Sequence, residues 1–210
     1  MTDMTADTAT DPDDSRILPV RQRRAVRRQR AILDAGRTLL RDVPFDSLRM
    51  EQIAVQAGCS VGTLYQRFKD KDALLDVILE EVVAELDVLM ADRLSQSAMT
   101  GLTAAEGVHH VVALVHGFLT ANQGLLRAII ARQLRQPDVI SPLQLAGVRL
   151  VSQSFDTISS LHGDFATEVD IVRYQFAMQT VIGTLNNAVI NRPGPYQIED
   201  PQMPGKLSEV

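Results

Sequence analysis

Apolar residues recur along this chain at intervals of three and four positions, the spacing that places side chains on one face of an α-helix. No segment of useful length alternates between apolar and polar residues as a strand would, so the pattern predicts an all-α fold. The predicted helices are a first one ending near residue 40, two short ones within 49–70, and longer ones over 71–95, 104–121, 124–136, 141–161 and 167–191. Residues 96–103 are predicted to form a loop.

The segment 49–70 has the features of two short helices joined by a tight turn. Gly58 favours the end of the first helix because glycine accepts the left-handed backbone conformation, and Ser60 is placed to cap the second. Leu64 and Phe68 lie one turn apart on one face and are predicted to be core. The other side of this helix presents Gly62, Thr63, Tyr65, Gln66 and Arg67. Such a unit lays its second helix in the DNA major groove, so the segment predicts binding to double-stranded operator DNA.

The charges are distributed unevenly along the sequence, although the net charge is only −5. Residues 15–72 hold 13 Lys and Arg against 6 Asp and Glu, whereas residues 73–210 hold 8 against 15. A basic cluster leads into the first helix and consists of Arg21, Arg23, Arg24, Arg27, Arg28 and Arg30. We expect Arg24 and Arg28 to contact phosphates, or this segment to enter the minor groove as an arm. A solvated arm without a role in DNA binding is the alternative interpretation.

The sequence also predicts the domain organisation and the compartment. It predicts a disordered N-terminal extension (1–20), a helix-turn-helix DNA-binding domain (21–70), a helical ligand-binding and dimerisation domain (71–191) and a loosely ordered, Pro-rich tail (192–210). The acidic N-terminus has no apolar signal-peptide core, and no run of about 18 apolar residues predicts a membrane partner. The single cysteine, Cys59, suits a reducing cytoplasm and is predicted to be a small buried hydrophobe.

The last two predicted helices are apolar around much of their circumference. A helix that is apolar on all sides must be covered on all sides, and a second subunit is the expected cover. The predicted homodimer interface consists of Gly147, Leu150, Phe155, Ile182, Gly183 and Leu185. The alternative is that both helices belong to the internal core of one chain.

Residues 21–75 resemble the TetR/AcrR family of bacterial transcriptional regulators. The matching runs are AILDAGRTLL, PFDSL and IAVQAGCSVGTLYQRFKDKDALL. Beyond residue 75 the resemblance is limited to the helical character and the long last helix. The family implies a homodimeric regulator, expected to be a repressor, whose body encloses a pocket for a small-molecule effector. Effector binding would move the 71–95 helix and take the two recognition helices away from the spacing that fits the operator.

The resemblance also implies roles for individual residues. Thr63 and Tyr65 would hold backbone phosphates, while Gln66 and Gly62 would face the bases or the groove floor. Lys71 would contact phosphate beside a helix N-terminus, which itself favours anions. Gln66 is chemically suited to adenine, to which an amide can make two hydrogen bonds in the major groove.

Three further positions near the turn are expected to meet DNA. Arg67 suits guanine, but its position favours a phosphate or an acidic neighbour. Val61 stands where the family often has a polar residue, and it either touches a thymine methyl group or packs. Arg49 replaces a residue that in relatives caps the second helix and touches phosphate. Because Arg49 cannot cap, Ser47 or Asp46 is expected to do so.

The effector pocket is marked in the sequence only by polar groups among apolar neighbours. The candidate ligand-binding residues are His109, His116, Phe118, Arg127, Tyr174 and Met178. A small hydrophobic molecule is the expected effector. A metal site built on His109, His110 and His116 is the alternative, but no carboxylate or cysteine lies at ligand spacing nearby, so neither a metal nor a cofactor is predicted.

Other classes of function are less consistent with the sequence. An enzyme is disfavoured because there is no Ser-His-Asp arrangement, no phosphate-binding glycine loop and no metal constellation. The alternative to an effector-released repressor is a helix-turn-helix protein that acts as an activator, or as a protein-interaction module without an inducer.

Overall fold

The computed structural model describes residues 20–135, 140–163 and 167–209, and within these ranges every regular element is helical. The predicted all-α fold is therefore confirmed. Residues 1–19 lie outside the described residues, so the predicted disorder of the N-terminal extension stays a prediction. In the part of the chain that the structure describes, no helix combines the length and the apolar character needed to cross a membrane.

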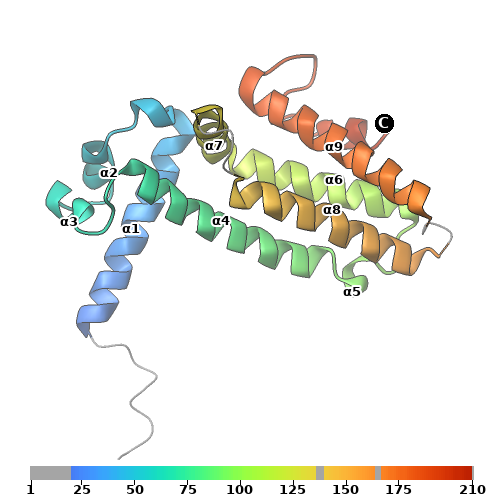
Figure 1. Ribbon diagram of the computed structural model, residues 1–210, viewed down its shortest axis with the longest axis horizontal. Coiled ribbons are helices and arrows are strands. Elements are labelled where there is room, and N and C mark those ends of the chain that lie inside the picture. Colours follow the sequence, from blue (N-terminus) through green and yellow to red (C-terminus); the bar gives the residue numbers. More distant parts are fainter. Residues whose placement is uncertain (1–19, 136–139, 164–166, 210) are drawn as a thin grey trace, which may run out of the picture.

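We call residues 20–70 the head. It consists of α1 (Val20–Asp42), the 3-10 helix η2 (Phe45–Ser47), α2 (Met50–Gln56) and α3 (Val61–Tyr65). In Figure 1 the N-terminal half of α1 extends away from the rest of the protein, with α2 and α3 beside its middle. Ile32, Ile53 and Leu64 are fully buried between these helices, and Phe68 is 5% exposed. The prediction that Leu64 and Phe68 are core residues is confirmed.

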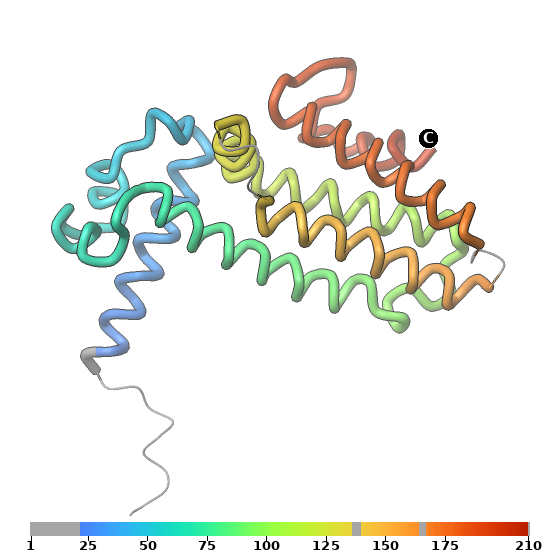
Figure 2. Tube along the Cα trace, in the orientation of Figure 1, coloured from blue at the N-terminus to red at the C-terminus, as the bar shows by residue number. Residues whose placement is uncertain are grey.

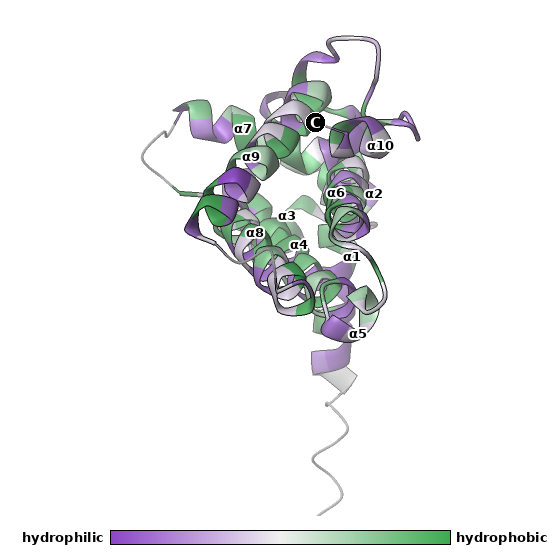
Figure 3. Ribbon diagram, turned by 90° about the vertical axis from the view of Figure 1, so that its right-hand side faces the viewer, coloured by the Kyte–Doolittle hydropathy of each residue, from purple (hydrophilic) through white to green (hydrophobic). Residues whose placement is uncertain are grey.

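We call the remaining helices the body. They are α4 (Lys71–Arg93), α5 (Gln96–Met99), α6 (Ala104–Ala121), α7 (Gln123–Arg135), α8 (Pro142–Leu161), α9 (Glu168–Asn191) and α10 (Met203–Ser208). Figures 1 and 2 show α4 running from the head along the body, with α6 and α8 beside it and α9 across them. Seen from the end farther from the head, α6, α8 and α9 surround one axis (Figure 3).

Most helices begin at a residue whose side chain accepts a backbone N–H from the first turn. These residues are Ser60, Asp70, Ser95, Thr103, Ser141 and Thr167. Pro142 fits the first position of α8 because that position needs no N–H donor. The prediction of a loop over 96–103 is wrong for its first part, since Ser95 caps the short helix α5 there.

Helix α7 packs directly against the head. A Cβ atom built on Gly124 would stand only 2.0 Å from the carbonyl oxygen of Leu40, so the backbones of α7 and α1 touch where only glycine fits. Farther along α7, Arg132 pairs with Asp76 on α4, and Arg135 pairs with Asp46 on η2. One body helix is therefore bound to the end of α1, to η2 and to α4.

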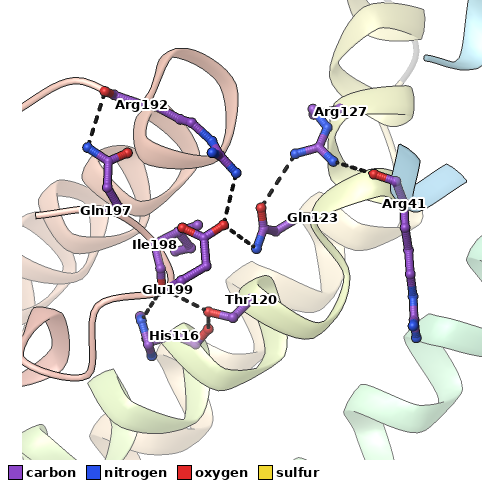
Figure 4. A network of polar contacts seen from close by, with 9 residues as sticks. All are labelled: Arg41, His116, Thr120, Gln123, Arg127, Arg192, Gln197, Ile198 and Glu199. Carbon is purple, nitrogen blue, oxygen red and sulfur yellow. Dashed lines mark hydrogen bonds and ion pairs between the residues drawn. The ribbon is translucent and has the colours of Figure 1, made fainter. Parts of the chain in front are cut away.

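The C-terminal segment (192–209) corrects the prediction of a loosely ordered tail. The chain leaves α9 through Arg192, whose φ of 50° is left-handed, and folds back to place α10 against α6. Ile198 is fully buried, and its carbonyl oxygen accepts hydrogen bonds from His116 Nε2 (2.7 Å) and Thr120 Oγ1 (3.3 Å) (Figure 4). The prolines of this segment suggested an irregular chain. The segment is nevertheless packed against the body, because Ile198 and Met203 are buried there.

Candidate nucleic-acid interface and cavity

The turn between α2 and α3 has the geometry that the glycine and the serine predicted. Gly58 has a φ of 65° and ends α2. Ser60 Oγ accepts the backbone N–H of Thr63 at 3.2 Å and lies 2.9 Å from Thr63 Oγ1. Thr63 is therefore half-buried and partnered, and the α3 side chain that projects most freely is that of Tyr65, which is 50% exposed.

The structure places the predicted DNA-binding residues in two groups. Gly62, Tyr65 and Gln66 are exposed on the outer side of α3 and of the turn that follows it. Val61 and Cys59 are half-buried and pack against the core. Of the two interpretations of Val61, packing or contact with a thymine methyl group, this position favours packing. These residues share one end of the head, next to the exposed half of α1 (Figure 1).

Two arginines near the turn have partners other than those expected. Arg67 donates from Nη1 to Gln29 Oε1 on α1 at 3.0 Å, so it meets an amide rather than an acidic neighbour. Arg49 itself occupies the position before α2, and its backbone N–H donates to Gln52 Oε1 at 2.9 Å. The prediction that Ser47 or Asp46 caps α2 is therefore wrong, because Gln52 reaches back instead.

Lys71 is engaged inside the protein. Its Nζ donates to the carbonyl oxygens of Phe45 (2.9 Å), Asp46 (3.0 Å) and Leu48 (3.4 Å), and it lies 4.9 Å from the centre of the Phe45 ring. These contacts join the start of α4 to η2. All three protons of the ammonium group have acceptors, so a phosphate contact by Lys71 stays a prediction that competes with this structural role.

The basic cluster lies on a helix rather than on an extended arm. Arg23, Arg24, Arg27 and Arg28 are exposed on the N-terminal half of α1. Among the described residues, none of the four has an acidic partner, whereas Arg30 pairs with Asp34 and Glu81. The four guanidinium groups therefore give this half of α1 a strong positive potential. The predicted entry of an arm into the minor groove would involve residues outside the described ranges, so it stays a prediction.

The body contains a cavity of about 630 Å³ between α6, α7, α8 and α9, with Leu86 of α4 also in its wall. Its floor consists of buried apolar side chains, which are Leu86, Val115, Phe118, Leu119, Leu126, Ile129 and Leu150. Its mouth lies between α8 and α9 and is formed by exposed residues, which are Gln144, Val148, Ser152, Gln175, Gln179 and Gly183. The volume falls within the range of about 300–1,000 Å³ that small-molecule pockets occupy.

Of the predicted ligand-binding residues, only Phe118 lines this cavity. Tyr174 is buried and donates from its hydroxyl to Ser154 Oγ at 2.8 Å, and burial raises the pKa of Tyr174 to about 12 although this bond acts in the opposite direction. Met178 is buried in the core. Neither Tyr174 nor Met178 is among the residues that line this cavity, so the structure gives no support to a ligand contact by them.

The three remaining candidates belong to contacts with the C-terminal segment and the head. His109 Nδ1 lies 3.0 Å from Ser208 Oγ, and His116 bonds to Ile198. Arg127 donates to Gln123 Oε1 (3.4 Å) and to the carbonyl oxygen of Arg41 (3.1 Å), and Figure 4 shows this network reaching the end of α1. The polar groups of His109, His116 and Arg127 therefore connect chain segments and do not line the cavity. The amide side chains that do line it are on α7, α8 and α9, and they were not predicted from the sequence.

The predicted dimer residues are divided between the core and the cavity. Leu150, Phe155 and Leu185 are at most 8% exposed in the single chain, so they have no surface left for a partner and that part of the prediction is wrong. Gly147, Ile182 and Gly183 line the cavity. The large apolar side chains that these two helices expose are instead Leu145, Val148, Val169, Val172, Phe176 and Ile190. On α9, Val169, Val172 and Phe176 are spaced by three and four residues. This spacing shows that they share a face, but the sequence alone does not show that the face is the exposed one.

Comparisons with known proteins agree with this geometry. The model of the family "Bacterial regulatory proteins, tetR family" matches residues 32–78. The HTH-type transcriptional regulator BetI of Cronobacter sakazakii is 31% identical over 90 residues, which are 43% of this chain and 42% of BetI. The chain therefore spans about two fifths of the length of the curated relatives that it matches.

Solved structures show the fold over most of the chain. A protein of Mesorhizobium loti assigned to the TetR family has a TM-score of 0.63 at 18% identity, covering 89% of this chain and 94% of that one. The transcriptional regulator FadR of Bacillus subtilis, solved in complex with stearoyl-CoA, has a TM-score of 0.55 at 19% identity, covering 86% and 95%. At these identities the likeness concerns the arrangement of helices.

The position of Lys71 leads to a stability prediction. Lys71→Met removes hydrogen bonds from a charged donor to three carbonyl groups, so we expect a loss of about 1.5–3 kcal/mol in the free energy of unfolding. The neighbouring Lys69 is exposed, and Lys69→Met should change stability little. Urea unfolding followed by circular dichroism measures both. Equal stability of the two variants would contradict the structural role and leave Lys71 available for phosphate.

Proposed function

Because the chain belongs to the TetR family of bacterial helix-turn-helix regulators, we propose that it is a ligand-responsive transcriptional repressor. It binds a partly palindromic operator as a homodimer in the cytoplasm and leaves the operator when a small, mainly apolar molecule enters its body. The observation that carries the proposal is the exposed outer side of α3, held by the buried Leu64 and Phe68 at the basic end of the head.

The head offers both kinds of contact that DNA recognition requires. Tyr65 and Gln66 project from α3 and the turn after it, where a hydroxyl reaches a phosphate and an amide reaches a base edge. Gly62 lets the helix approach the groove closely, and Thr63 adds a phosphate contact if it exchanges its bond to Ser60. Arg24 and Arg28 lie farther along the same end of the molecule and neutralise phosphates without reading sequence.

The homodimer rests on the outer faces of α8 and α9. Val169, Val172 and Phe176 follow one side of α9, and each is at least 56% exposed. Leu145 and Val148 occupy the corresponding side of α8. Exposed apolar side chains gathered on two neighbouring helices are typical of a protein interface, and a second copy would present the same surface by two-fold symmetry.

A ligand in the cavity can act on the head through α7. Leu126, Ile129 and Gln133 line the cavity, while Gly124, Arg132 and Arg135 of the same helix contact the head or the start of α4. Since α7 packs against both, displacement by a ligand changes the angle of the head. FadR, which shares this arrangement of helices, was solved in complex with stearoyl-CoA, and the long acyl chain of that molecule is consistent with an effector here that is apolar over most of its length.

Helix α4 provides a second connection. Arg37 on α1 donates to both carboxylate oxygens of Glu85 on α4 (2.6 and 2.8 Å), and this pairing lowers the pKa of Glu85. Leu86, the next residue, lines the cavity. Movement of α4 is thus transmitted to α1 directly.

An activator, or a protein-interaction module that needs no inducer, would use the same surfaces. Selection of an operator sequence by the protein would argue against the interaction module.

DNA recognition is tested by selecting duplexes from a random-sequence pool with the full-length protein and titrating the best one with salt. Arg24→Gln and Arg28→Gln should each lower the slope of log K against log salt by about one unit and weaken all sequences alike. Gln66→Ala should instead relax the choice at one base, at a cost of about 1–3 kcal/mol. Gln153→Ala on α8 is the control. Failure to enrich any sequence would refute the proposed operator binding.

The homodimer is tested by Phe176→Glu, which places a charge in the centre of the exposed apolar face. We expect monomer in sedimentation-velocity experiments and weaker operator binding, because an unpaired buried carboxylate is strongly unfavourable. Val88 on α4 is also apolar and 72% exposed but lies outside that face. Val88→Glu should remain dimeric. If Phe176→Glu stays dimeric as well, the interface lies elsewhere.

The role of α7 is tested by the double variant Arg132→Gln/Arg135→Gln. In the wild type, a neutral apolar probe such as decan-1-ol should weaken operator binding about tenfold, a typical allosteric coupling. The double variant should bind probe and operator separately but show a smaller effect of one on the other. Arg149→Gln breaks an ion pair with Asp87 inside the body and serves as the control. Undiminished coupling in the double variant would exclude these ion pairs from the path.

A further inference from the structure

We propose that the body cavity selects an uncharged molecule, apolar over most of its length, whose one polar end hydrogen-bonds to amide side chains at the mouth between α8 and α9. The inference deepens the proposed function, because it names the chemical class of the effector. The selectivity itself is a property of the cavity, and it can be measured without DNA.

The cavity wall carries no charge. Among the described residues that line it, none is Asp, Glu, Lys, Arg or His. Two arginines on helices that flank the cavity are already paired, Arg132 with Asp76 and Arg149 with Asp87. An ionic group drawn in beside the buried part of the wall would lose its water shell and gain no counter-charge from the described wall residues, which is strongly unfavourable. The buried part of the cavity therefore disfavours both carboxylates and ammonium groups.

The polar groups that do line the cavity are mainly amides on α9. Gln175, Gln179 and Asn186 lie on one side of this helix, separated by four and seven residues, which brings them into one row. No hydrogen bond within the described chain involves the side chains of Gln175 or Gln179, and Oδ1 of Asn186 is buried without a partner. A buried acceptor without a partner is unfavourable, so a ligand that donates to Asn186 Oδ1 is stabilised there, and the exposed amides of Gln175 and Gln179 can add further hydrogen bonds.

The remaining polar wall residues are less available. Ser141 Oγ accepts the backbone N–H of Leu143 at 3.2 Å, and Gln144 Oε1 accepts that of Ser141 at 2.9 Å. Both side chains are therefore used to cap α8. This leaves the amide row of α9, Ser152 of α8 and Gln133 of α7 to hydrogen-bond to the polar end of a ligand, while the apolar floor formed by α4, α6, α7 and α8 accommodates the rest.

This arrangement fixes the orientation of the ligand. Leu126 and Ile129, at the floor, are at most 5% exposed, whereas Gln175 and Gln179 are exposed at the mouth. An apolar chain placed against the floor removes its surface from water, and its polar end then reaches the amide row. Because an amide both donates and accepts, a hydroxyl or a carboxamide, which also does both, matches it better than a ketone, which only accepts.

The test uses four probes of one chain length on the full-length protein, namely decan-1-ol, decanamide, decanoate and decylammonium. Their dissociation constants are measured at pH 8 by displacement of the neutral dye Nile red. We expect both neutral probes to bind, and both ions to bind about ten times more weakly or worse. Decanoate or decylammonium binding as tightly as decan-1-ol would overturn the proposal.

Two pairs of variants place the probes in this cavity. Gly147 lines the cavity and Gly117 does not, and a Cβ on either glycine meets no neighbour within 4 Å. Gly147→Met should therefore block the neutral probes while Gly117→Met leaves them unchanged. Equal binding by both variants would show that the probes bind elsewhere.

The second pair reverses the selectivity. Gln179→Lys adds a positive charge at the mouth and should make decanoate bind more tightly than decan-1-ol. Gln153→Lys adds the same charge on the exposed surface of α8, outside the cavity, and should leave the order of the probes unchanged. No change of order in Gln179→Lys would refute the role of the amide row.

The two proposals can fail separately. If the protein binds the neutral probes but selects no operator, the inferred ligand class stands and the proposed regulatory function is refuted. If the protein binds an operator but prefers the charged probes, the proposed regulatory function stands and the inferred class of effector is refuted.

Discussion

The close contact between the start of α7 and the end of α1 determines how the two parts of the molecule are related. At Gly124 any side chain would collide with the carbonyl oxygen of Leu40, so the backbones can touch only because this residue is glycine. The contact brings Arg127 within reach of the Arg41 carbonyl and lets Arg135 pair with Asp46. The head is thereby attached to a body helix that also forms part of the cavity wall, and this geometry makes communication between cavity and DNA surface physically possible.

The distribution of charge complements this attachment. On the outer half of α1 the exposed arginines have no acidic partners among the described residues, whereas nearer the body Arg30 and Arg37 pair with Glu81 and Glu85 of α4. Among the described residues, unpaired positive charge is therefore concentrated on the half of α1 that lies beside α3. The acidic residues of the body repel phosphate, so the field of the whole molecule favours approach of DNA from the α3 end.

The sequence predicted the helices well because their ends are determined by local chemistry. Capping by Ser60, Asp70 and Thr103, and the left-handed Gly58, depend on a few neighbouring residues and are visible in one sequence. These signals, with the apolar spacing of Leu64 and Phe68, were enough for the helix-turn-helix and its exposed side.

The errors concern long-range packing, which local patterns do not encode. Ile198 is buried where the C-terminal segment returns to α6, and its carbonyl oxygen accepts from His116 and Thr120, 82 and 78 residues away in the chain. The motif around Lys71 likewise gave no sign of its structural role, because the carbonyl groups of Phe45, Asp46 and Leu48 that its ammonium contacts come from 23 to 26 residues earlier, and its phosphate contact stays a prediction. A pocket in the body was expected, but most of its lining residues were not predicted, since an apolar position at helical spacing lines a core or a cavity equally well.

Helix α9 shows why the body resisted assignment from its sequence. Its three faces have different environments: Met178, Val181 and Leu185 are core, Gln175, Gln179 and Asn186 line the cavity, and Val169, Val172 and Phe176 are exposed. Successive residues of a helix are about 100° apart, so the exposed apolar face adjoins the amide row, with Phe176 next to Gln175. A second subunit seated on that face would therefore stand beside the mouth of the cavity. Because one helix carries both surfaces, a ligand that shifted α9 would also shift a dimer contact on that face, and in such a dimer the spacing of two heads on DNA would depend on both.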